Sequence, residues 1–166
     1  MPKITDRTDL VFGSTKTYTA SVGLSTAFRQ WRASSHCKHL HGYALEFSAT
    51  FEATELNDNT WVIDFGGLKD FRKWLENMFD HTTLVAQDDP IYDWFLEASQ
   101  LNIAENPLDL RIVKNTGCEA IALLTFEKLE QWLQENHHSP RAKLVRLEVR
   151  EHAGNSAYVR LSNYAR

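Results

Sequence analysis

Apolar and polar residues alternate most regularly between residues 43 and 53. The apolar positions of one parity are Tyr43, Leu45, Phe47, Ala49 and Phe51. The polar positions of the other parity are Glu46, Ser48, Thr50 and Glu52. Successive side chains of a β-strand point to opposite faces, so this pattern predicts a strand with one buried face.

A second alternating segment lies near the end of the chain. Its apolar residues are Val145, Leu147 and Val149, and charged residues stand between them. Turn-forming residues follow at 153–155, and residues 157–161 again favour an extended conformation. The pattern predicts a β-hairpin built from strands at 145–150 and 157–161.

Two other segments show helical spacing. Residues 66–79 place apolar side chains three to four positions apart, at Leu68, Phe71, Leu75 and Met78. Asp64 can cap this helix. Residues 118–134 show the same spacing at Ala122, Phe126, Leu129 and Leu133. Both segments are expected to form amphipathic helices that bury one face.

The remaining segments give shorter patterns. Strand or extended conformation is predicted for 16–28, 61–63 and 110–113, and a turn for 55–59. Between residues 87 and 106 the chain is acidic and aromatic. A helical turn around Trp94 and Phe95 is the one element predicted there.

The order of these elements predicts the fold class. Two strands, two helices and two strands follow one another, with a short extra strand before the second helix, an α+β order written β-β-α-α-β-β. We expect an antiparallel four-stranded sheet with two helices on one face. A length of 166 residues, 43% of them hydrophobic, suits one domain spanning residues 1–166.

The charge pattern bears on possible partners. The net charge is −4 and the charges are interspersed, which argues against nucleic acid or an anionic membrane surface as the main partner. No apolar run approaches the roughly 18 residues of a membrane span, and the N-terminus shows no signal-peptide core. Cys37 and Cys118 do not resemble a disulfide framework. We expect a cytoplasmic protein without a membrane or nucleic-acid partner.

Candidate chemistry is concentrated in one stretch, His-Cys-Lys-His-Leu-His-Gly-Tyr at residues 36–43. It places the thiol of Cys37 beside three imidazoles. A cysteine acts as a nucleophile or base through its thiolate, which nearby cationic or metal charge favours, and imidazoles ligate divalent metals. The alternative interpretation of His36 and His39 is that they are solvated loop residues.

Four segments, in the same order, resemble the 6-pyruvoyl-tetrahydropterin synthase and 6-carboxy-tetrahydropterin synthase family, which has the tunnelling fold. They are residues 37–42 (Cys-Lys-His-Leu-His-Gly), 61–65 (Trp-Val-Ile-Asp-Phe), 79–81 (Phe-Asp-His) and 149–151 (Val-Arg-Glu). Residues 115–119 resemble a further family segment loosely. The resemblance covers the chain from Thr15 to Leu161.

The resemblance implies roles for a catalytic set. Cys37 would be the base, and Asp80 would orient His81, which relays a proton. Glu151 would hold the pterin, because a carboxylate can accept two hydrogen bonds from the amino-pyrimidinone edge. Glu151 also continues the inward-facing row of the strand at 145–150, although an acid there could equally be a surface charge.

Glu119 and Cys118 are further candidates for substrate binding, since they stand in the segment at 115–119. The alternative for Glu119 is structural, because an acid at the start of a helix suits the helix macrodipole.

A metal site is implied as well. The family binds zinc through three histidines, and the matching positions here hold Phe28, His41 and Tyr43. Only one of the three imidazoles remains. Three neutral imidazoles with an open fourth position suit a catalytic divalent metal. We therefore predict a rebuilt site for a divalent metal, zinc by resemblance, with His41, His39 and His36 as ligands.

The resemblance implies a lyase that acts on 7,8-dihydroneopterin triphosphate. We expect the 6-carboxy-5,6,7,8-tetrahydropterin synthase type, in 7-deazaguanine and queuosine biosynthesis. The alternatives are a 6-pyruvoyl-tetrahydropterin synthase and a non-catalytic pterin- or purine-binding paralogue with a decayed metal site. Open sheet edges invite pairing, and tunnelling-fold proteins join their subunits edge to edge into a barrel. The resemblance therefore implies a homotrimer or stacked homohexamer with sites at subunit junctions.

Overall fold

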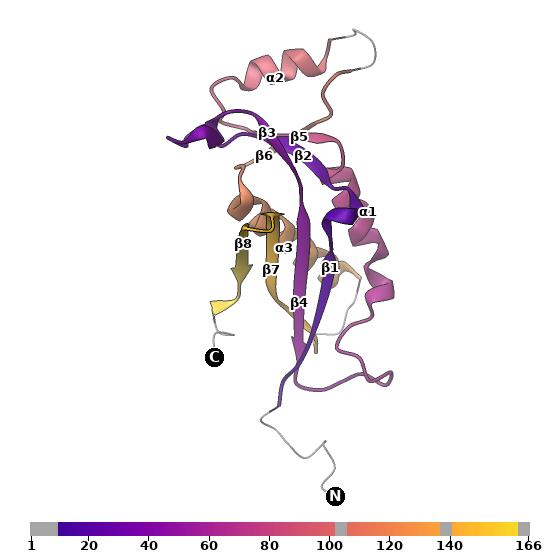
Figure 1. The fold of residues 1–166 in the computed structure, drawn as a ribbon. Coiled ribbons are helices and arrows are strands. Elements are labelled where there is room, and N and C mark those ends of the chain that lie inside the picture. The colour runs from indigo at the N-terminus through magenta and orange to yellow at the C-terminus, as the bar shows by residue number, and fades with distance from the viewer. Residues whose placement is uncertain (1–9, 102–105, 137–140, 163–166) are drawn as a thin grey trace, which may run out of the picture.

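The computed structural model describes residues 10–101, 106–136 and 141–162, and its strands form two sheets (Figure 1). The larger sheet is antiparallel in the order β1-β4-β7-β8. Its strands are β1 (Phe12–Tyr18), β4 (Glu46–Ala53), β7 (Lys143–His152) and β8 (Asn155–Arg160). This sheet confirms the predicted antiparallel four-stranded arrangement and the closing hairpin.

The second sheet is a finding that the sequence pattern did not predict. Its order is β3-β2-β5-β6, with β2 antiparallel to β3 and parallel to β5, and with β5 parallel to β6. Its strands are β2 (Ser25–Phe28), β3 (His41–Ala44), β5 (Thr82–Ala86) and β6 (Leu110–Val113). All five residues of β5 are buried, so this strand has no alternation of apolar and polar positions to reveal it.

Two predicted strands are each divided between the sheets. The segment at 16–28 is interrupted by a 3₁₀ turn at Ala20–Val22 and by Gly23, which has a φ of 84°. The segment at 43–53 begins at His41 and breaks at Leu45, whose N–H donates to the carbonyl of Leu24 at 2.9 Å. The break is hidden in the sequence because burial alternates without interruption through it. Residues 61–63 form no strand and lead into a 3₁₀ turn at Phe65–Leu68 instead.

The helices agree more closely with the sequence. Helix α1 spans Lys69–Phe79 and α3 spans Cys118–Glu135, while α2 (Tyr92–Ser99) extends the helical turn expected around Trp94 and Phe95. The Asp64 side chain accepts from the N–H of Gly66 at 2.7 Å, which caps the turn before α1 as predicted. No helix in these described ranges is long and apolar enough to cross a membrane.

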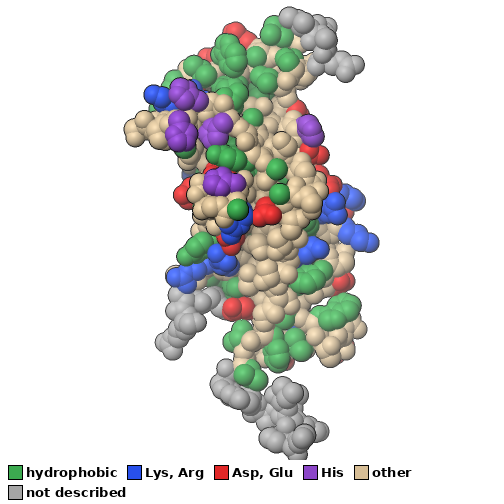
Figure 2. Space-filling view, in the orientation of Figure 1, with side chains coloured by type: hydrophobic (Ala, Val, Ile, Leu, Met, Phe, Trp, Pro, Cys, Tyr) green, Lys and Arg blue, Asp and Glu red, His purple; other side chains and the backbone are tan. Residues whose placement is uncertain are grey.

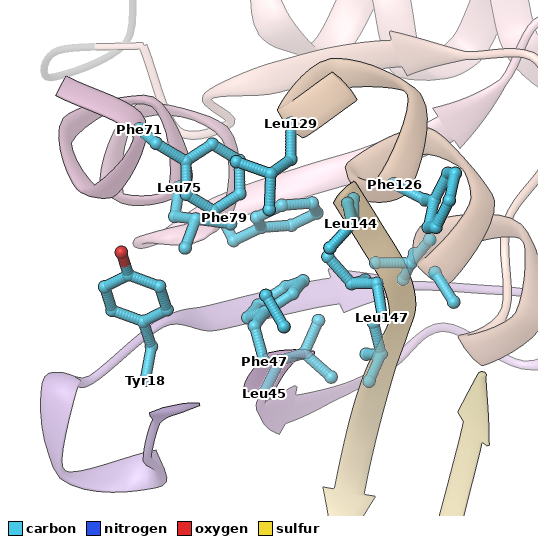
Figure 3. Close-up of a cluster of buried hydrophobic side chains, with 14 of the residues drawn as sticks. Tyr18, Leu45, Phe47, Phe71, Leu75, Phe79, Phe126, Leu129, Leu144 and Leu147 are labelled. Carbon is cyan, nitrogen blue, oxygen red and sulfur yellow. The ribbon is translucent and has the colours of Figure 1, made fainter. Parts of the chain in front are cut away.

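The core lies between the larger sheet and helices α1 and α3 (Figure 3). The sheet contributes side chains from the buried faces of β4 and β7, among them Phe47 and Leu147. Helix α1 contributes Phe71, Leu75 and Phe79, and α3 contributes Phe126 and Leu129. Phe47 and Phe79 are in tilted contact with their ring centroids 4.8 Å apart, a favourable aromatic geometry.

A buried ion pair joins the smaller sheet to the segment before α2. Two of the three guanidinium nitrogens of Arg29 donate to the Asp89 carboxylate, Nε to Oδ2 at 2.8 Å and Nη2 to Oδ1 at 3.0 Å. The Asp89 side chain is 1% exposed, and its Oδ1 also accepts from the N–H of Ile91 at 2.9 Å. Arg29 follows the last residue of β2, so the pair fixes the end of this strand.

Replacing Asp89 by Asn should destabilise the protein strongly, because it leaves the Arg29 charge without its buried partner. We expect a loss of about 3 kcal/mol in the free energy of unfolding, measured by urea denaturation. The matched control is Asp88→Asn, because Asp88 pairs with Arg32 on the surface, where an ion pair contributes little. Similar losses in the two variants would contradict this role of Asp89.

Candidate active site

Cys37 lies in a 3₁₀ turn, His36–Lys38, between β2 and β3. The Ser35 side chain accepts from the Cys37 N–H at 3.4 Å and caps this turn. The Cys37 carbonyl accepts from the N–H of Gln30 at 2.9 Å, and the Lys38 carbonyl accepts from Nη1 of Arg29 at 3.4 Å. Two residues just after β2, Arg29 and Gln30, therefore hold the backbone at and directly after the half-buried Cys37.

Three rings meet where β2 pairs with β3. Phe28 is directly opposite His41 in the register, and Tyr43 follows two residues later on the same face. The ring centroids are 5.4 Å apart for Phe28 and His41, 5.3 Å for His41 and Tyr43, and 6.0 Å for Phe28 and Tyr43. The His152 ring lies 6.1 Å from that of Tyr43. We call Phe28, His41 and Tyr43 the aromatic triangle.

A cavity of about 330 Å³ opens between the start of α3 and the turn from β7 to β8. Its walls include Gln30, Cys118, Glu119, Glu151 and the turn residues 154–157. Glu151 is half-buried at the end of β7, where the pairing with β8 shifts register. Three of the predicted substrate-binding residues, Cys118, Glu119 and Glu151, thus line one cavity.

The electrostatics of this cavity centre on Glu151. Burial raises the pKa of the Glu151 carboxyl, and the negative charge of Glu119 raises it further. His41 and His152 act in the opposite direction and lower it. The carboxyl is therefore under the influence of a second acid and of two imidazoles, and one of these, His41, belongs to the aromatic triangle.

Cys118 is a neutral thiol in this setting. Burial, followed by the negative charge of Glu151, raises the pKa of Cys118 to about 11. Its Sγ donates to the carbonyl of Val149 at 3.2 Å. Cys118 can therefore shape the wall of the cavity, but a base that must be ionised near neutral pH is better supplied elsewhere.

Tyr43 connects the cavity to the Cys37 turn. Burial raises the pKa of the Tyr43 phenol, and electrostatic interaction with Glu151, followed by Cys37 and Cys118, raises it further. These three groups come from distant segments of the chain, and each acts electrostatically on the same phenol.

Asp80 and His81 lie apart from this group. Nδ1 of His81 is 2.5 Å from Oδ1 of Asp80, so the predicted pair is formed. The backbone N–H of His81 donates to the carbonyl of Ser25 at 2.7 Å. This bond places His81 beside the first residue of β2, at the opposite end of the strand from Phe28. His81 has a φ of 55°, an unusual value outside glycine, and its side chain is 88% exposed.

A model of the 6-pyruvoyl tetrahydropterin synthase family matches residues 17–162. The chain belongs to this family. A 6-carboxy-5,6,7,8-tetrahydropterin synthase from Aquifex aeolicus is 25% identical over 138 residues, which cover 81% of this chain and 82% of that protein. A protein of the same name from Rickettsia conorii is 37% identical over 54 residues, which cover 32% of this chain and 39% of that protein.

Solved structures of other proteins share the fold of this chain. An uncharacterized protein from Wolinella succinogenes has a TM-score of 0.76 at 19% identity, covering 92% of this chain and 99% of that one. The 6-pyruvoyl tetrahydropterin synthase of Plasmodium vivax has a TM-score of 0.64 at 20% identity, covering 91% of this chain and 98% of that one.

The described residues do not fit the zinc ion implied by the family. They contain no group of three or more His, Cys, Asp or Glu side chains that could hold a metal. His36 and His39 are exposed, and the carbonyl of His39 lies 2.7 Å from Nδ1 of His41. Histidines gather on one side of the face shown in Figure 2. Metal binding by His36, His39 and His41 stays a prediction and requires these side chains to converge.

No role is predicted from the sequence for Gln30 or His152. Gln30 holds the Cys37 turn through its N–H and also lines the cavity. His152 accepts from the N–H of Gly154 at 3.1 Å through Nδ1, which turns its ring within the hairpin toward Tyr43. The position of His152 directly after Glu151 is the one sequence feature that points to a place for it near the cavity.

Replacing Glu151 by Gln should stabilise the protein near pH 7. Its pKa is raised on folding, so the stability that this group contributes is present below its ordinary pKa and is lost as the pH rises through the folded-state pKa. We expect a higher melting temperature for Glu151→Gln at about pH 7 and a smaller difference at about pH 4. Glu127→Gln, on the exposed side of α3, is the control, and a lower melting temperature for Glu151→Gln would contradict this electrostatic assignment.

Proposed function

We propose that the protein is a lyase of the 6-carboxy-5,6,7,8-tetrahydropterin synthase type, which acts on 7,8-dihydroneopterin triphosphate in 7-deazaguanine and queuosine biosynthesis. The observation that carries this proposal is the cavity that holds Glu151 and Glu119 beside Tyr43, with Cys37 in the adjoining turn. The names of the Aquifex and Rickettsia relatives support the choice of reaction. A cytoplasmic location is part of this proposal.

Recognition of the pterin would depend on Glu151. The amino-pyrimidinone edge offers a ring N–H and an amino group, and one carboxylate can accept both. The cavity volume of about 330 Å³ lies within the range of small-ligand pockets. Glu119 supplies a second acceptor on the same wall, and the neutral Cys118 thiol supplies an uncharged surface.

Cys37 would remove the proton from the substrate side chain. A thiolate is the reactive form of cysteine, and Lys38, the next residue in the chain, is a cation that can favour it. Loss of this proton leads to elimination of triphosphate. Asp80 would keep His81 in one tautomer so that its other ring nitrogen can return a proton.

We propose that His81 acts on the site of a neighbouring subunit. His81 and the Cys37 turn flank opposite ends of β2, so one subunit does not complete the set by itself. Both β1 and β8 are edges of the larger sheet, and open edges favour pairing between copies. A homotrimer, stacked as a homohexamer, would bring Asp80 and His81 of one copy to Cys37 of the next.

A non-catalytic pterin- or purine-binding protein is the second candidate. Phe28 and Tyr43 favour it, because they occupy two positions where the family has zinc ligands. A 6-pyruvoyl-tetrahydropterin synthase stays a further alternative, since the described cavity does not distinguish the two reactions. In the binding protein Glu151 would keep its role while Cys37 would have none.

Turnover of 7,8-dihydroneopterin triphosphate by purified protein tests the proposed reaction, together with pterin affinity measured by calorimetry. Cys37→Ser should abolish turnover and keep pterin affinity, because it replaces a base and not a binding group.

Glu151→Gln should weaken pterin binding by about 10- to 100-fold, since a charge-assisted contact is lost. Tight pterin binding without turnover by the unaltered protein would support the binding protein instead.

A mixture of inactive subunits tests the shared site. Cys37→Ala and His81→Ala should each be inactive alone, because each lacks one half of the set. When equal amounts are unfolded and refolded together, about a quarter of the sites combine an intact Cys37 with an intact His81, so about a quarter of the activity should return. Failure to recover activity from correctly assembled mixtures would show that each subunit uses its own His81.

A further inference from the structure

The aromatic triangle has the dimensions of a three-histidine zinc centre. Zinc binds imidazole nitrogen at about 2.0–2.1 Å with tetrahedral angles, which puts the centroids of neighbouring imidazoles roughly 5 Å apart. The centroids of Phe28, His41 and Tyr43 are 5.3, 5.4 and 6.0 Å apart. We propose that ring packing by these three residues replaces the metal centre, so that this subunit binds no zinc at this position.

Strand pairing fixes where the three side chains stand. Phe28 and His41 are direct partners across β2 and β3, and Tyr43 occupies the next position of the same face. Exchanging the side chains would therefore leave their Cβ positions almost unchanged. The backbone remains suited to three converging imidazoles, and the identity of two side chains prevents metal binding.

The chemistry of the side chains in the aromatic triangle explains why this position does not bind zinc. The benzyl side chain of Phe28 has no donor atom and is fully buried, so it closes one coordination position with carbon. His41 keeps the arrangement of a ligand, because Nδ1 donates to the His39 carbonyl at 2.7 Å and leaves the Nε2 lone pair free. One imidazole cannot hold zinc against water, since protein zinc sites use three or four ligands.

Contacts between the aromatic rings hold these side chains together in place of a metal ion. His41 and Tyr43 meet edge to face, with an interplanar angle of 87°, and Phe28 is tilted against both rings. Such geometries are favourable for rings 4.5–7 Å apart. His152, which directly follows Glu151 in β7, continues the ring contacts from Tyr43.

The test compares the unaltered protein with the double variant Phe28→His/Tyr43→His. Zinc content after purification is measured by mass spectrometry, and Co²⁺ titration is followed by visible absorption. We expect no stoichiometric zinc in the unaltered protein. The double variant should bind one Co²⁺ or Zn²⁺ per subunit, with an affinity raised by about 100-fold or more. Tyr158→His, on β8, adds an exposed histidine elsewhere and should bind no more than the unaltered protein.

One zinc ion per subunit in the unaltered protein would overturn the proposal. Loss of that ion in His36→Ala and His39→Ala would then identify the rebuilt three-histidine site. A folded double variant that binds neither metal would also overturn it, because the triangle would not be the metal position. If the double variant does not fold, the single variant Tyr43→His must bind Co²⁺ more tightly than the unaltered protein.

Pterin binding is measured separately on the same preparations. The proposal rests on family membership and on the geometry of the triangle, so it is independent of turnover. Pterin binding by zinc-free protein is compatible with it, and absence of pterin binding would count against the proposed function alone.

Discussion

The pairing of β2 with β3 is the contact on which the site depends. Four residues of each strand pair, and this short ladder places position 28 opposite position 41. Gly42 permits the approach, because a Cβ there would meet the carbonyl oxygen of Thr26 at 3.1 Å. The twelve residues between the strands, 29–40, carry the Cys37 thiol and the exposed His36 and His39. A side chain at position 42 would thus disturb the turn and the aromatic triangle together.

The same strand also positions the cavity. Oγ1 of Thr116 donates to the carbonyl of Arg29 at 2.6 Å, which ties the loop before α3 to the end of β2. Gly117 has a φ of 102°, and a Cβ there would lie 2.2 Å from Nε2 of Gln30. The start of α3 can therefore approach β2 only through a glycine. Because Cys118 and Glu119 follow directly, the chemistry of the cavity wall is set by this close backbone contact.

The sequence pattern predicted those strands and helices in which burial repeats at one regular spacing. It missed the places where a single alternating run of residues continues from one sheet into the other. Strands β4 and β7 and helices α1 and α3 each bury one regular face, so alternation or helical spacing identified them. The break at Leu45 keeps the same parity on both sides and leaves no trace in the pattern. For the site, motif residues such as Cys37 and Glu151 could be named from their order. Their convergence on Tyr43, and the distance of His81 from them, depend on strand pairing that a local pattern does not encode.

Electrostatics suggest why the cavity is built as it is. Burial raises the pKa of Glu151, and the negative charge of Glu119 on the same cavity wall raises it further, so a charged Glu151 carries a cost there. A ligand edge rich in N–H groups would donate hydrogen bonds to both carboxylates and so offset the cost of their negative charges. An acceptor-rich ligand would increase the cost instead. His41 and His152 partly offset the two acids, and the aromatic triangle orients His41. In the proposed pterin complex, selectivity for a donor-rich ring would follow from this balance of acids and imidazoles. The aromatic triangle would keep one of the imidazoles, His41, in place.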